Sequence, residues 1–401
     1  MSESIAGAED WRALASGTYA WFEAPSQTTG AALVARIAGL TDLLEVNLRD
    51  RGVQVRIDGS SGLELASAIS AAAKGLGLTA DPSALQDLRV RIGAADRSAV
   101  IPFWHAVLGY ETVGDDQLAD PLRRDPAFSF HQLDESLPLR NRPHVDVCRP
   151  QTLTAGVTAA EAAGGRVAFD GGDHYRTMAD AEGNEADIVS AQELAGGPET
   201  ADWRTAFGGM TFYPTTSTAQ AAELATAVAG LVDETGMALM VDLRPDGVTI
   251  DTGKDLWEDA RFADLARRVQ AAARDLKLTA DPSRLRFVQF GIDAVDIAAV
   301  RTFWQTVLGY DPDTRPYLSD IYDPRWLNPV LFFQPMDPSD EARRAQRNRI
   351  TLELLVPGDQ LQNRIETALA TGGRIVHQDS PQRCTLADPE NNELDLVTTD
   401  L

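Results

Sequence analysis

A histidine and an aspartate stand two residues apart in the segment Arg-Asn-Arg-Pro-His-Val-Asp-Val, and together they could do acid/base chemistry. His144 and Asp146 alternate with Val145 and Val147. A period of two is typical of a β-strand and places the two polar side chains on the same face. Imidazole titrates near neutral pH, so such a pair could recognise a polarised oxygen or move a proton without a metal ion.

The remaining histidines and the cysteines form no pattern of a metal or thiol site. We expect His105 on an exposed helix surface, whereas three histidines lie near strand or loop ends with no evident partner: His131, His174 and His377. Cys148 and Cys384 are far apart and form no CxxC pair, so neither a disulfide framework nor a thiolate zinc site is indicated. We interpret both as small core residues.

The elements that position these residues occur twice, because the chain is a tandem repeat. The matching segments are LTADPS at 78–83 and 278–283, FWxxVLGY at 103–110 and 303–310, RNR at 140–142 and 347–349, and GGRV at 164–167 with GGRI at 372–375. The offset grows from 200 to 207 and 208 residues, which indicates an insertion of about seven or eight residues in the second copy.

Each copy divides near LTADPS, where Asp-Pro disfavours a continuing helix. Before this point the patterns predict a helix, a strand hairpin and an Ala-rich helix, over 34–44, 46–59 and 66–78 in the first copy and 223–234, 240–252 and 262–278 in the second. The segment 191–203, rich in Gly, Ala and acidic residues, is the natural linker between the copies.

After the boundary, a strand and an amphipathic helix follow in each copy. Leu88, Val90 and Ile92 alternate with Arg89 and Arg91, which predicts a strand. The apolar residues that follow have helical spacing and are interpreted as core anchors: Val100, Phe103, Trp104, Val107 and Leu108, matched by Val300, Phe303, Trp304, Val307 and Leu308.

Over residues 84–192 and 284–401 this order of landmarks, closed by a D-x-E-[GN]-N-E segment, resembles the vicinal-oxygen-chelate (glyoxalase/bleomycin-resistance) superfamily. The resemblance implies two βαβββ modules whose sheet curls round a cup. It also implies a divalent metal held by side chains from the first strands of the two modules and from the last strand. The segment around His144 fits the family's N-R-x-H-x-D-like pattern on the second module.

The resemblance assigns ligand-site positions in each cup. The first cup receives Arg89, His144, Asp146 and Asp187, and the second receives Gln289, Thr351, Glu353 and Asp395. A further family position falls near 130–134 and 333–337 without a firm alignment.

A guanidinium has no lone pair to coordinate a cation, and Thr351 is a weak donor, so we expect no catalytic metal in either cup. Instead, Arg89 is expected to pair with Asp187, and Arg89, His144 and Asp146 are the candidate catalytic residues of the first cup, which we expect to be the stronger ligand site.

The preceding segments, 8–80 and 203–280, resemble the pterin-4a-carbinolamine dehydratase fold, with VDLR-like strands and a closing helix. That family's active-site histidines are replaced in both copies, at Asp42–Glu45 and Met237–Met240 and again at Asp58–Ser61 and Asp251–Lys254. Without a group that titrates near neutrality, we expect no dehydratase activity and a structural role.

Composition limits the partners. With 36 basic against 60 acidic residues the net charge is −24, which would repel nucleic acid. No apolar run is long enough to span a bilayer, and the acidic start lacks the features of a signal peptide, so we expect a cytoplasmic protein without a membrane partner. We expect a monomer or a homodimer and no cofactor.

These observations predict an α+β protein of four domains, at 8–80, 84–192, 203–280 and 284–401. The leading hypothesis is a metal-independent protein that binds a small organic, natural-product-like molecule, either a sequestering or resistance protein or a tailoring lyase, isomerase or cyclase. The alternatives are a metal-dependent glyoxalase- or dioxygenase-type enzyme and a non-catalytic interaction scaffold.

Overall fold

The computed structural model describes residues 8–14, 17–58, 62–135 and 137–398, which divide into two compact units. Among the described residues, the first unit contains 8–85 and 191–285, and the second contains 86–190 and 286–398. Each unit therefore takes one segment from each copy of the repeat.

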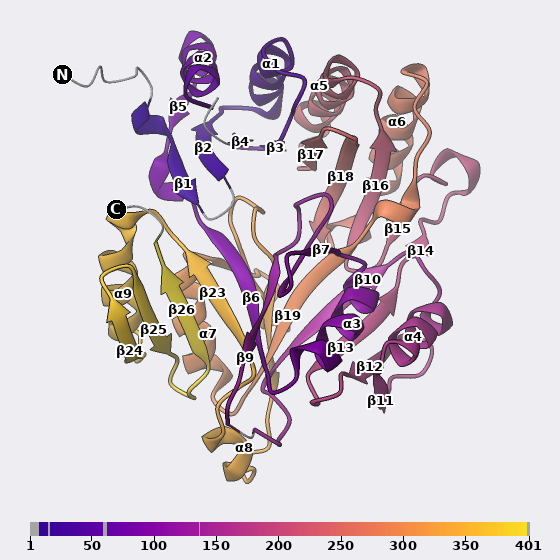
Figure 1. Cartoon of the computed structure of the whole chain (residues 1–401). Coiled ribbons are helices and arrows are strands. Elements are labelled where there is room, and N and C mark those ends of the chain that lie inside the picture. Colours follow the sequence, from indigo (N-terminus) through magenta and orange to yellow (C-terminus); the bar gives the residue numbers. More distant parts are fainter. Residues whose placement is uncertain (1–7, 15–16, 59–61, 136, 399–401) are drawn as a thin grey trace, which may run out of the picture. The chain divides into compact units, whose positions relative to one another are not determined.

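The first unit is a ten-stranded sheet with four long helices (Figure 1). Its strands are β1 (Arg12–Leu14), β2 (Gly17–Glu23), β3 (Val46–Arg49), β4 (Gly52–Ile57), β5 (Thr79–Ala80), β14 (Gln192–Glu193), β15 (Arg204–Thr205), β16 (Gly208–Pro214), β17 (Met240–Arg244) and β18 (Gly247–Lys254). Its helices are α1 (Gln27–Ala38), α2 (Gly62–Gly75), α5 (Thr218–Thr235) and α6 (Phe262–Asp275). The antiparallel pair β3–β17 joins the two copies, and one apolar cluster unites helices and sheet.

The segment predicted as a linker, 191–203, is part of this unit instead. It contains β14, and Trp203 is fully buried with its indole N–H donated to the carbonyl of Ala266. The prediction was wrong because a single buried tryptophan anchors a segment whose Gly and acidic content otherwise indicates a loop. Met237, Leu239 and Met240 are also buried here, as apolar contacts.

The second unit contains two eight-stranded sheets. The β10–β19 sheet has the order β11-β12-β13-β10-β19-β22-β21-β20, and the β6–β23 sheet has the order β24-β25-β26-β23-β6-β9-β8-β7. From the first copy come β6 (Asp87–Ala94), α3 (Arg97–Leu108), β7 (Glu111–Val113), β8 (Gln117–Ala119), β9 (Phe128–Gln132), β10 (Pro143–Arg149), α4 (Leu153–Ala162), β11 (Arg166–Asp170), β12 (Tyr175–Ala179) and β13 (Glu185–Ser190). From the second come β19 (Phe287–Ala294), α7 (Ile297–Leu308), β20 (Asp311–Pro312), β21 (Ile321–Tyr322), β22 (Leu331–Pro335), α8 (Glu341–Ala345), β23 (Ile350–Leu355), α9 (Leu361–Ala370), β24 (Arg374–Ser380), β25 (Arg383–Ala387) and β26 (Glu393–Val397).

The two copies exchange modules in this unit. Strand β10 of the first copy pairs with β19 of the second, and β6 of the first pairs with β23 of the second, both antiparallel. We expected the two modules of one copy to share a sheet, and that grouping is wrong. Period-two alternation could not reveal the exchange, because it fixes which side chains share a face but not which strand lies alongside.

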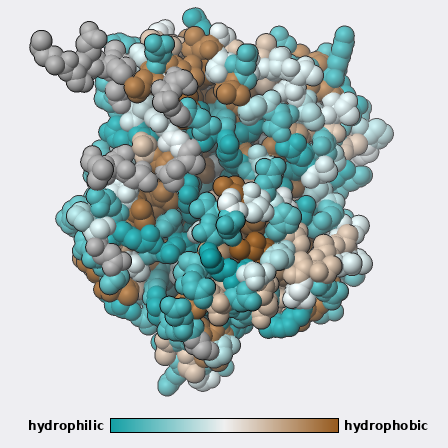
Figure 2. Space-filling view, viewed as in Figure 1, coloured by the Kyte–Doolittle hydropathy of each residue, from teal (hydrophilic) through white to brown (hydrophobic). Residues whose placement is uncertain are grey.

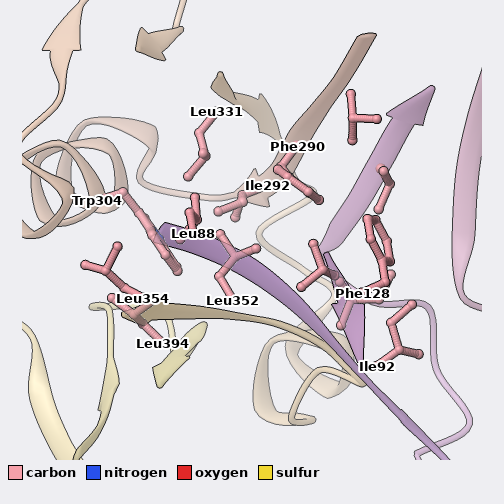
Figure 3. Close-up of a cluster of buried hydrophobic side chains, with 14 of the residues drawn as sticks. Leu88, Ile92, Phe128, Phe290, Ile292, Trp304, Leu331, Leu352, Leu354 and Leu394 are labelled. Carbon is pink, nitrogen blue, oxygen red and sulfur yellow. The ribbon is translucent and has the colours of Figure 1, made fainter. Parts of the chain in front are cut away.

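The apolar faces of both sheets form one core with the helices. Figure 3 shows Leu88 of β6, Phe290 of β19 and Leu352 of β23 converging in this cluster. All ten predicted helix anchors are buried, and so are Cys148 and Cys384. Helices α3 and α7 end at Gly109 and Gly309, whose left-handed φ of 64° and 67° few residues other than glycine adopt at low cost.

The repeated Arg-Asn-Arg motif links the copies. Arg142 is fully buried. Among the described residues its side chain donates hydrogen bonds only to groups of the second copy, including Asn392 Oδ1 at 2.7 Å and the carbonyl of Arg343 at 2.7 Å. Arg349 reciprocates by donating to Asn184 Oδ1 and to the carbonyl of Gly183 in the first copy. The closing D-x-E-[GN]-N-E segments therefore accept hydrogen bonds from these two arginines, and the contacts link the two copies.

Hydrophilic residues predominate on the face shown in Figure 2, where hydrophobic residues form small, separate patches. Within the described residues, no helix combines the length and the apolar character that crossing a bilayer requires. His105 is exposed on α3, as predicted.

Candidate functional site

Four polar side chains converge on the β10–β19 sheet, on the face opposite the apolar core. We name His144, Asp146, Asp187 and Gln289 the His144 cluster. Asp146 is in register with Asp187 on the parallel neighbour β13 and with Gln289 on the antiparallel neighbour β19. Val145 and Val147 lie in the core, which confirms the predicted alternation.

The geometry of the His144 cluster suits a cation. Ligand atoms of His144, Asp146 and Asp187 all lie within 4.8 Å of one another. The Gln289 amide donates from Nε2 to Asp146 Oδ2 at 2.8 Å, which leaves its Oε1 available as an acceptor. Within the described chain, His144 Nδ1, Asp187 Oδ1 and Gln289 Oε1 are buried and have no hydrogen-bond partner. Buried polar atoms normally have a hydrogen-bond partner, and these three, which converge at one place, are available to a ligand, an ion or water.

A glycine makes room for the imidazole. Gly291 is in register with His144, and a Cβ at that position would lie 2.5 Å from His144 Nε2 and 2.7 Å from Phe332 Cζ. Phe332, aligned with Gly291 from β22, meets the imidazole edge-on with ring centroids 5.6 Å apart. The aromatic ring of Phe332 offers no ligand atom.

The β6–β23 sheet presents a different set at the corresponding positions. We name Arg91, Arg383, Glu353 and Asp395 the Arg91 cluster. Arg91 forms an ion pair with Asp395, and Arg383 Nη2 lies 2.6 Å from Asp395 and 3.4 Å from Glu353. Thr385 also donates to Asp395, at 2.6 Å. The carboxylates are thus held by guanidiniums of the chain itself.

His131 lies on β9 of the same sheet. Burial, followed by the positive charges of Arg91, Arg383 and Arg347, lowers its pKa from the ordinary 6.5 to about 4. Its Nδ1 is buried and has no hydrogen-bond partner among the described residues. The imidazole is therefore neutral at neutral pH, next to three guanidiniums.

This shift predicts a pH-dependent loss of stability. Well above pH 6.5, His131 is unprotonated in both the folded and the unfolded state. Between pH 6.5 and about 4, His131 takes up a proton in the unfolded chain but not in the folded chain. The free energy of unfolding therefore falls as the pH falls. Allowing for solvent screening, the loss is about 1–2 kcal/mol at pH 4.5.

Urea unfolding of wild type and His131→Gln at pH 7 and pH 4.5 measures this loss. Glutamine is the residue at the corresponding position 334 of the other sheet. The variant should lose about 1–2 kcal/mol less than wild type over this interval. Equal losses in the two proteins would contradict the assignment.

The module exchange regroups the predicted site residues. Arg89 lies on the β6–β23 sheet, in register with Glu353, and its Nε is 2.8 Å from Asp87 rather than paired with Asp187. Gln289, expected beside Thr351, lies next to Asp146 instead. The other three residues of each set lie on one sheet as expected, and only Arg89 and Gln289 were assigned wrongly, because their strands β6 and β19 belong to the opposite sheets.

Several residues in or beside the two clusters were not identified as site residues from the sequence. Gly291 carried a signal, since a glycine inside a strand indicates close approach of another group. Arg91 was recognised as a strand residue, but its alternation with Leu88, Val90 and Ile92 did not show which carboxylate it meets. Arg383 and Thr385 follow no motif, and only the fold brings them to Asp395.

Two regions of the chain, residues 89–189 and 289–397, match the family model described as a glyoxalase-like domain. Together they cover more than half of the sequence and contain both clusters. The dehydratase-like resemblance of the first unit lies outside the matched regions. No curated protein matches the sequence.

Among solved structures, the cppA protein from Streptococcus pneumoniae is 10% identical with a TM-score of 0.34, over 78% of this chain and 98% of that chain. A glyoxalase/bleomycin resistance protein from Albidiferax ferrireducens is 14% identical with a TM-score of 0.22, over 27% of this chain and 95% of that chain. A hypothetical protein from S. aureus is 11% identical with a TM-score of 0.22, over 27% of this chain and 89% of that chain.

Proposed function

Because the chain belongs to the glyoxalase-like domain family, we propose that the His144 cluster binds a small organic molecule through an oxygen atom, with the help of a divalent cation. The observation that carries the proposal is the convergence of His144, Asp146 and Asp187 within 4.8 Å. The Arg91 cluster does not support a cation site, because Arg91 already neutralises Asp395.

The donor set fits a first-row divalent ion. One imidazole, two carboxylates and the Gln289 amide oxygen are ligands that manganese, iron or zinc accepts. The expectation of a metal-free site depended on the guanidinium of Arg89. The corresponding residue beside Asp146 is Gln289, and Gly291 opposite His144 leaves space for the imidazole. A bound cation would polarise a carbonyl or hydroxyl oxygen of the ligand.

The chain's own residues would orient that ligand. Gln289 holds Asp146 by a hydrogen bond, and Asp146 Oδ1 lies 3.6 Å from His144 Nε2. This second contact supports the alternative function, a metal-free site in which His144 moves a proton of a tailoring reaction. Both functions use the same small-molecule site, and metal binding distinguishes them.

A titration of the chelator-treated full chain with Mn²⁺ or Zn²⁺, followed by calorimetry, tests the proposal. We expect about one ion per chain, and a loss of affinity of more than about 100-fold in His144→Ala, because that change removes a ligand atom. His105→Ala, on the exposed face of α3, is the matched control and should bind normally. If wild type binds no ion, or His144→Ala binds as tightly, the metal-free alternative replaces the proposal.

A further inference from the structure

The two clusters of the second unit differ in charge at corresponding positions. Where the β10–β19 sheet has Gln289, Gly291 and Tyr175, the β6–β23 sheet has Arg89, Arg91 and Arg383. The carboxylates are retained, since Glu353 and Asp395 match Asp146 and Asp187. The second sheet therefore adds three positive charges and loses none of the negative ones.

The added guanidiniums keep donors that the protein does not use. Arg91 donates a hydrogen bond through Nη1 alone, and its Nε is 3.9 Å from Glu353. Arg383 donates through Nη2 alone. Within the described chain, the remaining N–H groups of both residues donate to no protein group, and the two side chains are 23% and 33% exposed. A guanidinium presents five N–H donors in one plane, so Arg91 and Arg383 can each donate hydrogen bonds to a further oxygen ligand.

The surroundings of these donors favour negative charge. Arg89 lies on the same face and is held by Asp87 at the start of β6. The buried Nδ1 of His131 has no described hydrogen-bond partner, and the charges that lower the pKa of this imidazole are those of guanidiniums. Glu353 and Asp395 are the negative charges that an anion would meet beside Arg91 and Arg383, and both lie within ion-pair distance of Arg383, which offsets their repulsion.

We propose that the Arg91 cluster is a second ligand site, which binds the anionic oxygens of a carboxylate or phosphate group through Arg91 and Arg383. The site is independent of the cation proposed for the His144 cluster, because it lies on the other sheet and uses other residues. One sheet thus carries a site for a cation and the other sheet a site for an anion.

Inorganic phosphate and oxalate, titrated separately into the full chain, test the proposal and distinguish the two sources of anionic oxygen. The chain has only five histidines, so the imidazole NMR signals of His131 can be assigned by comparison with His131→Gln. We expect at least one anion to shift the His131 signals and to raise the pKa of this residue, because a negative charge stabilises imidazolium.

Arg383→Tyr copies the residue of the other sheet and should weaken anion binding by about 10- to 100-fold, since it removes charge-assisted hydrogen bonds. Arg91→Gln should do the same. Arg267→Gln, which removes one positive charge from the exposed surface of α6, is the control and should bind as wild type does. Absence of binding of both anions up to about 20 mM, or unchanged affinity in a folded Arg383→Tyr protein, overturns the proposal.

Discussion

Arg142→Ala should lower the free energy of unfolding by about 3–5 kcal/mol, because it removes a fully buried side chain with five hydrogen bonds to the other copy. The acceptors, among them Asn392 and the carbonyls around α8, would remain buried with fewer donors. Each unsatisfied group costs about 1–3 kcal/mol. Guanidinium chloride unfolding at pH 7 measures the loss.

Two variants test the specificity of this effect. Arg142→Lys keeps the charge but not the planar fork of donors, and should still lose about 2 kcal/mol or more. Arg140→Ala removes the first arginine of the same motif, whose side chain is 45% exposed, and should cost about 1 kcal/mol or less. A similar loss for Arg140→Ala and Arg142→Ala would mean that burial is not what makes this motif important.

Gly291→Ala should destabilise the protein by about 1–3 kcal/mol and weaken binding of a divalent cation more than tenfold, because the new methyl group collides with the His144 imidazole. The backbone of Gly291 has an ordinary strand conformation, so the effect comes from the side chain rather than from strain. Chemical denaturation and metal titration on the same samples measure the two losses.

A double-mutant cycle isolates the cause. In a His144→Ala background the imidazole is gone, so Gly291→Ala should cost less than about 1 kcal/mol. If Gly291→Ala is equally costly with and without His144, the imidazole is not the group that requires glycine, and the close approach of Phe332 becomes the better explanation.

Much of this architecture could be predicted because it depends on local patterns. The repeat follows from the spacing of LTADPS, FWxxVLGY and RNR, and alternation placed Val145 in the core and His144 on the opposite face. The helix anchors followed from a 3.6-residue period. These features were predictable because side-chain direction along a strand or helix is fixed by backbone geometry.

Partner choice between strands could not be predicted in the same way. Strands β6 and β19 have equivalent apolar faces, so either could cover the core beside β10. The difference lies on the polar face, where the side chains of the two strands differ in charge and in size. With the copies unexchanged, Arg91 would face His144, and Gly291 would face Thr351. In the observed pairing Gly291 faces His144 and Arg91 faces Thr351, so each large side chain meets a small one.

The sequence by itself thus determined the elements, their buried faces and the residues that could do chemistry. Only the tertiary structure decided which of them share a site, because complementary side-chain sizes across a strand pair act between residues about 147 and 260 positions apart. The same pairing gave one sheet a set of ligand atoms without a guanidinium, and it gave the other sheet carboxylates neutralised by arginines.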